Sequence, residues 1–331
     1  MVKLDAPAAS LTAALRIRTY AGQVDDQPIV DVMTAAHLAD DFDYIPTVEQ
    51  FASEVEHPAG FDPQRHIVVG ELAGRVVAVG RVAYVRRAGE DTYEISADVH
   101  PEVPRREIGR AILNRLEGLA RDMAADRPAG ASCRYASWCV DSAEDTRALL
   151  TAEGYRPARY YLEMVRDGLA DIPETPLPDG LEMRPVEAAD HRRIFDAQAE
   201  AFQDHWGARE WTDANFEGMF GAPDLDTSLW RVAWEGEEVV GVCANWVYAE
   251  ENERLGVNRG WLEQVSVRRP WRRRGVARAL IGASLRAFAD RGLTSAALAV
   301  DADNPTGALG LYEGLGFRVN KPATMYRKAM S

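Results

Sequence analysis

The sequence predicts a mixed α/β protein built from two tandem domains of similar architecture. The chain has 331 residues, a length that suggests about two domains. Between residues 261 and 317 a strand-like run, an apolar helical run, a second strand and a short helical run follow one another. This alternation is typical of α/β folds. Segments of the first half also recur in the second half at nearly constant spacing, which indicates an internal duplication.

The duplication is visible in three pairs of matching segments that lie between 162 and 168 residues apart: 15–18 with 181–184, 109–113 with 277–281, and 154–156 with 316–318. Between the halves, residues 171–180 contain three prolines, which break any regular element and make a stiff connection. We therefore expect a first domain over 1–168, a Pro-rich linker over 169–180 and a second domain over 181–331.

The elements of the second domain follow from its hydrophobic pattern. Residues 261–267 alternate as a strand, and residues 276–289 form an apolar helical run that ends at a basic turn followed by Gly292. Glycine is the usual residue just past the end of a helix. A second strand over 296–300 follows, and then a short helical run through Ala308, Leu311 and Tyr312.

The turn over residues 272–277, Arg-Arg-Arg-Gly-Val-Ala, joins the first strand to the helix. Small residues at Gly275 and Ala277 let backbone N–H groups approach an anion at a helix N-terminus, where the helix dipole adds to the attraction. Six arginines lie between residues 268 and 278, although the chain carries a formal charge of −14. This local excess of positive charge predicts an anionic ligand, such as a phosphate-bearing cofactor.

Together these segments resemble the GNAT superfamily of acyl-CoA-dependent N-acetyltransferases. The resemblance rests on the strand, the Arg-x-x-Gly-x-Ala turn, the helix and the later pattern Asn304…Ala308…Leu311-Tyr312…Gly316-Phe317. It is strongest over residues 181–331 and implies a bent mixed β-sheet flanked by helices in each domain. It further implies acetyl-CoA as cosubstrate, and a tandem type in which the C-terminal half is catalytic.

The resemblance also implies roles for individual residues. Tyr312 would protonate the departing thiolate, and Glu263, on the same strand face as Val267, would take the proton of the amine through a water molecule. The positions that would hold the cofactor are Val265, Val267, Arg272, Arg273, Arg274, Gly275, Val276, Ala277 and Asn304.

The first domain departs from this pattern where the cofactor would bind. At the positions of Arg272, Gly275, Asn304 and Tyr312 it has Pro104, Glu107, Ser142 and Leu150. A carboxylate repels an anion, and a proline lacks the N–H that a phosphate cradle uses. We therefore expect a degenerate, non-catalytic first domain, although Arg105, Arg106 and Arg110 leave weak nucleotide binding open.

The acceptor side is expected between the first two helices of the second domain. Asp204, His205 and Trp206 lie there, and Trp246 is a further candidate for an apolar wall. Asp204, His205 and Glu250 are alternative bases. Acidic side chains favour a cationic amine over nucleic acid, so the sequence predicts transfer of an acetyl group to a primary amine of a small molecule.

Two alternatives stay open. A protein or peptide N-acetyltransferase would use the same chemistry with an open acceptor groove. A non-catalytic acyl-CoA sensor would keep the cradle but would need neither Tyr312 nor Glu263.

Composition bounds the remaining possibilities. Hydrophobic residues make up 47% of the chain and charged residues 27%, as in ordinary globular proteins. The start of the chain has no long apolar run, so we expect no signal peptide, no membrane association and a cytoplasmic location. The three cysteines are scattered, which predicts neither a metal site nor a disulfide framework. The sequence does not indicate an oligomeric state.

Overall fold

The computed structural model describes residues 14–330 except 59, 88, 128–131 and 305–306. The expectation of no signal peptide falls on a segment, residues 1–13, outside the described residues. The chain divides into an N-terminal unit, residues 1–160 with 323–331, and a C-terminal unit, residues 161–322. Among the described residues, no helix combines the length and the apolar character needed to cross a bilayer.

The N-terminal unit contains a mixed sheet with the strand order β1-β2-β3-β4-β5-β12. Its pairs are antiparallel except for β4 and β5, which are parallel. Its elements are β1 (Arg16–Thr19), η1 (Gln23–Asp25), α2 (Asp26–Ala39), α3 (Val48–Glu56), α4 (Pro63–His66), β2 (Ile67–Leu72), β3 (Arg75–Arg87), β4 (Glu90–Val99), α5 (Arg105–Ala125), β5 (Cys133–Val140) and α6 (Glu144–Ala152).

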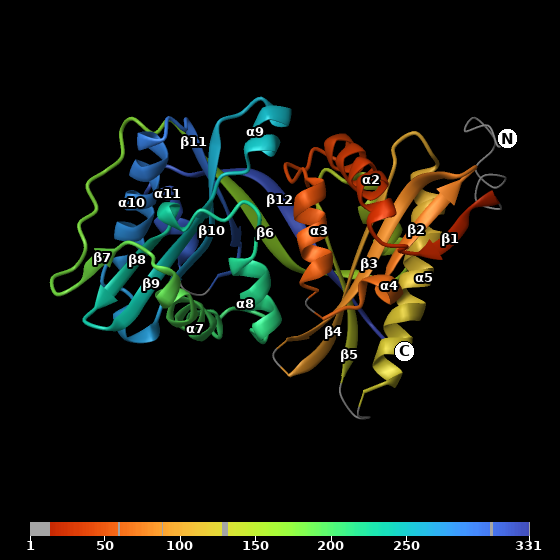
Figure 1. The fold of residues 1–331 in the computed structure, drawn as a ribbon, viewed down its shortest axis with the longest axis horizontal. Helices are drawn as coiled ribbons and strands as arrows, with labels where there is room; N and C mark the ends of the chain where they lie inside the picture. Colours follow the sequence, from red (N-terminus) through yellow and green to blue (C-terminus); the bar gives the residue numbers. More distant parts are fainter. Residues whose placement is uncertain (1–13, 59, 88, 128–131, 305–306, 331) are drawn as a thin grey trace. The chain divides into compact units, whose positions relative to one another are not determined.

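The C-terminal unit repeats this plan with the strand order β6-β11-β10-β9-β8-β7, in which β10 and β11 are the parallel pair. Its elements are β6 (Arg156–Asp167), β7 (Glu182–Arg184), η2 (Ala188–Asp190), α7 (His191–Phe202), α8 (Asp213–Phe220), η3 (Thr227–Leu229), β8 (Arg231–Glu235), β9 (Glu238–Trp246), α9 (Ala249–Leu255), β10 (Arg259–Val267), η4 (Arg269–Trp271), α10 (Val276–Asp290), β11 (Ser295–Asp301), α11 (Ala308–Glu313) and β12 (Arg318–Ala329). Figure 1 shows the helices of this unit on both faces of its sheet. The prediction of a mixed α/β fold in two tandem domains is confirmed.

Two long strands divide differently from the sequence expectation. Residues 161–167 of β6 pair with β11 in the C-terminal unit, and residues 323–329 of β12 pair with β5 in the N-terminal unit. Tyr326, which is 4% exposed, belongs to the N-terminal core. Each unit therefore takes a strand from the other half of the chain, which hydrophobic periodicity alone does not reveal.

The expected linker has no regular secondary structure and packs against the helix α10. Thr175 is 6% exposed, and its side chain lies against Gly282, where an added Cβ would meet its Oγ1 at 2.0 Å. Arg166 Nη2 donates to the carbonyl of Asp171 at 2.7 Å. These contacts of Thr175 and Asp171 fix the proline-rich segment to the C-terminal unit.

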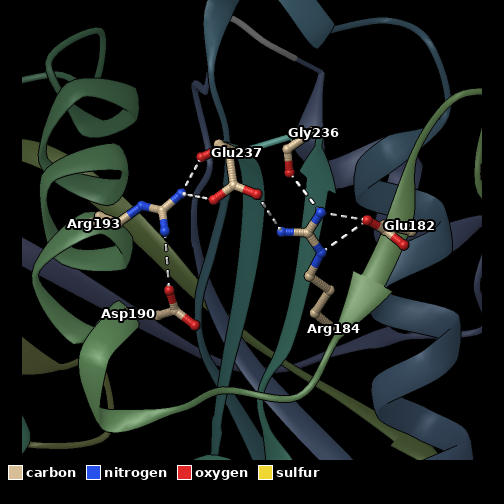
Figure 2. Close-up of polar contacts among 6 residues, drawn as sticks. All are labelled: Glu182, Arg184, Asp190, Arg193, Gly236 and Glu237. Atoms are coloured by element: carbon tan, nitrogen blue, oxygen red, sulfur yellow. Dashed lines mark hydrogen bonds and ion pairs between the residues drawn. The ribbon is translucent and has the colours of Figure 1, made fainter.

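The short edge strand β7 is fastened by charged side chains that Figure 2 shows. Arg184 Nη2 donates to the carbonyl of Gly236 at 2.6 Å, in the turn between β8 and β9. Arg193 on α7 reaches the carboxylate of Glu237 in the same turn at 3.2 Å. Both guanidinium groups lie over the Trp234 ring, 5.2 and 4.8 Å from its centre. These contacts anchor β7 and α7 to the hairpin formed by β8 and β9.

Candidate functional site

The strands β10 and β11 separate at the centre of the C-terminal sheet. Their parallel pairing covers three residue pairs and ends at Trp261 with Ala297, although β10 continues to Val267. Arg268 N–H donates to Val240 on β9 at 3.0 Å. Because backbone groups alternate in direction along a strand, those of Val265 and Val267 face the opposite, open edge. Figure 1 shows β10 running beside β9.

Glu263 lies at an irregularity of the same strand. The register of β10 on β9 shifts between Leu262 and Gln264, so Glu263 is the extra residue of a β-bulge, a feature that re-aims a side chain. Glu263 Oε1 accepts a hydrogen bond from the Tyr248 hydroxyl at 3.0 Å. The residue is exposed to solvent. Desolvation by neighbouring protein atoms raises the pKa of the Glu263 carboxyl, and the Tyr248 hydrogen bond partly opposes the rise.

The turn before α10 forms a concave row of backbone N–H groups. Arg273 has φ +63° and Gly275 has φ +92°, conformations that turn successive N–H groups to one side. Within the described residues, no N–H group of residues 273–278 donates a hydrogen bond, and the first bond of the helix runs from Ala279 N–H to Gly275 at 3.0 Å. Such orphan donors at a helix N-terminus make an anion site.

The six arginines around this turn fall into two groups. Three are held by carboxylates of the same unit: Arg268 by Glu200 at 2.8 Å and Glu238 at 2.6 Å, and Arg269 and Arg272 by Asp204, at 2.6 Å for Arg272. Arg272 also donates to the carbonyls of Val267 at 2.9 Å and Ala201 at 3.0 Å. Its side chain therefore fastens the turn to β10 and α7.

The other three arginines are available to a ligand. Arg273, Arg274 and Arg278 form no ion pair with any residue that the structure describes, and Arg273 and Arg274 are exposed. They flank the row of free N–H groups. The turn and the start of α10 therefore combine orphan donors with three unpaired positive charges, which fits a pyrophosphate and its neighbouring phosphate groups.

Tyr312 lies on α11 and is 7% exposed. Its ring packs edge-on against Phe317, with 6.1 Å between the ring centres. Burial raises the pKa of the Tyr312 hydroxyl above its ordinary value, with a smaller contribution from Cys243. Asn304 lies in the turn after β11, where its N–H donates to Asp301 at 3.1 Å. Val276 is buried at the first position of α10, and Ala277 follows it half-buried.

The residues expected on the acceptor side have diverse surroundings. The two guanidinium groups on Asp204 hold the pKa of its carboxyl far below the usual range, so Asp204 is a weak base. Desolvation lowers the pKa of His205, whose ring lies 4.6 Å from Phe202. Trp206 is half-buried in the turn after α7. Trp246 is 7% exposed and packs on Trp230 in the core, which gives this ring a structural partner.

Comparison with known proteins decides the family. The sequence model described as "Acetyltransferase (GNAT) family" matches residues 33–148 and 191–317. The chain belongs to the acetyltransferase (GNAT) family. The two matched regions coincide with the duplicated halves, so the predicted tandem GNAT organisation is confirmed.

The curated relatives described here are mycothiol acetyltransferases. Mycothiol acetyltransferase of Salinispora arenicola is 29% identical over 303 residues, which cover 90% of this chain and 92% of that protein. Mycothiol acetyltransferase of Streptomyces bingchenggensis is 30% identical over 269 residues, covering 80% of this chain and 81% of that protein. The protein is an acyl-CoA-dependent N-acetyltransferase.

Solved structures agree on the architecture. A GCN5-related N-acetyltransferase from Sphaerobacter thermophilus superposes with a TM-score of 0.72 at 26% identity, covering 96% of both chains. A tandem GNAT protein from the clavulanic acid biosynthesis pathway superposes with a TM-score of 0.68 and covers 96% of this chain and 99% of its own. Its 17% identity shows the fold alone.

The N-terminal GNAT unit differs at the corresponding turn. Its helix α5 begins after Pro104 without a side-chain cap. Arg105 binds the carboxylate of Asp40, and Ser142 Oγ donates to the Asp40 carbonyl at 2.5 Å. Leu150 is 3% exposed in the core. Where β4 and β5 separate, a cavity of about 230 Å³ remains. Asp40, Arg105 and Arg106 are among the residues that line this cavity.

Two features of the site were not predicted. Tyr248 was not predicted as a partner of Glu263, yet its hydroxyl donates a hydrogen bond to that carboxylate. Gln198 is fully buried on α7, and its Nε2 donates to Gln264 Oε1 at 2.8 Å. Both contacts depend on which strands and helices are neighbours, and no local sequence signal marks them. Across the described parts of the chain, no cluster of three or more His, Cys, Asp or Glu residues could hold a metal ion.

Proposed function

We propose that the C-terminal GNAT unit transfers an acetyl group from acetyl-CoA to the primary amine of a small molecule. One observation carries the proposal: the turn over residues 272–277 presents free N–H groups and is flanked by three unpaired arginines. In the N-terminal unit the corresponding Arg105 is bound to Asp40, and Pro104 has no N–H to offer. The turn with two residues at positive φ and the three unpaired arginines, which suit a CoA pyrophosphate, are therefore features of the C-terminal unit.

The residues along β10 and α11 suit acyl transfer. Bound acetyl-CoA supplies an activated thioester carbonyl. Glu263 accepts a proton from the amine, directly or through a water, because an amine must be neutral to attack a carbonyl. The N–H groups of Val265 and Val267 on the open edge of β10 orient the cosubstrate and stabilise negative charge on the carbonyl oxygen.

Tyr312 completes the reaction by stabilising the departing thiolate. Its raised pKa keeps the hydroxyl protonated throughout the neutral range. A phenol of raised pKa is also a weaker acid, so full proton transfer to a free thiolate, whose conjugate acid has a pKa of about 8.5, runs uphill. Tyr312 therefore acts by donating a hydrogen bond to the sulfur while the C–S bond breaks, and this bond stabilises the negative charge that develops there.

The name shared by the relatives supports a small molecule as acceptor. Mycothiol acetyltransferases align along 90% of this chain at 29% identity, a level that supports the type of acceptor more than its identity. Among the acidic residues near the expected acceptor side, Asp204 is neutralised by two arginines, whereas the Glu263 carboxylate has a hydroxyl as its partner. Glu263 is thus the acidic group best placed to attract a cationic amine.

The proposal is tested by measuring the release of CoA thiol from acetyl-CoA across a panel of small primary amines and short peptides with free N-termini or lysines. Amine-dependent release is expected with small amines. Release that occurs only with peptides supports the protein acetyltransferase alternative. Tight acetyl-CoA binding with no release for any acceptor supports the sensor.

A further inference from the structure

The carboxylate of Glu263 receives its hydrogen bond from a different segment of the chain. Tyr248 immediately precedes α9, beyond the end of β9. Its hydroxyl lies 3.0 Å from Glu263 Oε1. Within the described residues, this hydroxyl is the sole hydrogen-bond donor to the Glu263 side chain. The extra residue of a β-bulge is left unpaired in the sheet, and the bulge re-aims its side chain. The hydrogen bond from Tyr248 then holds the Glu263 carboxylate in that direction.

We propose that Tyr248 is a positioning residue that holds Glu263 in its ionised form and aims it at the acceptor amine. The inference rests on the proposed function, because it gives Glu263 the role of base. Tyr248 would act through Glu263, and it would not contact the reacting atoms itself.

The electrostatic surroundings leave Tyr248 as the group that stabilises the ionised carboxylate. Surrounding protein raises the pKa of the Glu263 carboxyl, and the hydrogen bond from Tyr248 lowers it. Tyr312 on α11 stays neutral because burial raises its pKa. Four acidic side chains of the neighbouring α7 and α9 regions have partners of their own: Glu200 with Arg268, Asp204 with Arg269 and Arg272, Glu250 with Arg254, and Glu251 with Trp261.

Removal of the Tyr248 hydroxyl leaves the Glu263 carboxylate in the same surroundings without its hydrogen-bond donor. The ionised form then loses stabilisation while the protonated form does not, so the pKa of Glu263 rises. A hydrogen bond to a charged group has a magnitude that corresponds to a shift of about one pH unit. A base must be ionised to work, so activity at low pH should fall first.

The experiment compares pH profiles of kcat/KM for the wild type and Tyr248→Phe, with an amine substrate identified by the panel. The acidic limb of Tyr248→Phe should move up by about one pH unit, with activity approaching the wild-type plateau at higher pH. The melting temperature should stay unchanged, because the substitution removes only the Tyr248 hydroxyl, whose hydrogen bond is exposed to solvent. Tyr84→Phe is the matched control, because Tyr84 also donates to a carboxylate, Asp91, at 3.0 Å in the N-terminal unit. Its profile should equal that of the wild type.

Glu263→Gln separates the two levels of the hypothesis. If Glu263→Gln removes the acidic limb and most activity, but Tyr248→Phe keeps the wild-type midpoint, the role of Tyr248 is overturned while the proposed base stands. If Glu263→Gln keeps full activity and an unchanged limb, Glu263 is not the base, and both levels are overturned. A shifted limb in Tyr248→Phe together with a lost limb in Glu263→Gln supports the inference.

Discussion

The Tyr312 hydroxyl lies in a nearly buried position whose aromatic ring has an independent packing role. The ring is 7% exposed and contacts Phe317 edge-on. Tyr312→Phe keeps this packing and removes the group that would stabilise the thiolate. We expect turnover to fall by about 10²-fold, in the range typical of general acids, with little change in melting temperature.

Steady-state kinetics and a thermal melt check this prediction. Tyr326→Phe alters another buried tyrosine, 4% exposed in the N-terminal core, and should leave turnover unchanged. Full activity in a well-folded Tyr312→Phe protein would show that water or another group stabilises the departing thiolate.

Gly275 separates backbone strain from charge at the cradle. It has φ +92°, and an added Cβ would meet no atom within 4 Å, so any larger residue is strained there without a steric clash. Gly275→Ala and Gly275→Glu share that strain, but only the second adds a negative charge beside the anion. Gly275→Glu should weaken acetyl-CoA binding at least about tenfold, or ~1.4 kcal/mol, relative to Gly275→Ala. Equal acetyl-CoA affinities of the two variants by calorimetry would show that no phosphate group binds at this turn.

Single residues also show what the sequence could reveal. The glycine and the small residue at Ala277 were enough to predict a cradle at the start of a helix, because few backbone conformations serve that purpose. The division of the arginines was not predictable. Arg268 depends on Glu200 and Glu238, which lie 68 and 30 residues away in the chain. The same limit applies to Asp204, expected as a possible base but found between two arginines.

At the scale of elements, the arginines in and just before α10 lie in two different environments. Arg273 and Arg274 flank its N-terminus without ion-pair partners in the described part of the chain, whereas Arg286 lies further along and reaches the linker at Pro173 and Thr175. Replacing Arg273 and Arg274 together by alanine should weaken acetyl-CoA binding by about tenfold and reduce its sensitivity to salt. Arg286→Ala should change neither property. Titrations at low and high ionic strength check this, and equal effects in the two variants would contradict it.

The strand β12 links the end of the chain to the stability of the N-terminal unit. Residues 323–329 pair with β5, Thr324 Oγ1 donates to Asp141 at 2.7 Å, and Lys328 Nζ lies 2.7 Å from Glu117. Deleting residues 323–331 should therefore speed amide hydrogen exchange in β5 strongly, because that strand loses its pairing with β12 and keeps only its short pairing with β4. Exchange in β9 should change little. Hydrogen exchange measured by mass spectrometry tests this, and uniform loss of protection in both strands would contradict the assignment of β12 residues to separate units.

For the whole molecule, the repeat and the family pattern were visible in the sequence, but the path of the chain between the units was not. The expected boundary at residue 168 followed the proline-rich segment, whereas compact packing changes at residue 160 and again at residue 322. The reason is physical. Alternation of side chains can indicate that a segment forms a strand, but the choice of its partner is set by backbone hydrogen bonds, and these are similar for any neighbouring strand.

The two units of the repeat differ at the turn that precedes their long helix. The C-terminal turn has free N–H groups and unpaired arginines, whereas the N-terminal helix follows a proline and its Arg105 is bound to Asp40. The most direct test is a calorimetric titration of the wild-type protein with acetyl-CoA. The account predicts one tight site per chain, which Gly275→Glu should weaken. Two equally tight sites per chain would contradict it.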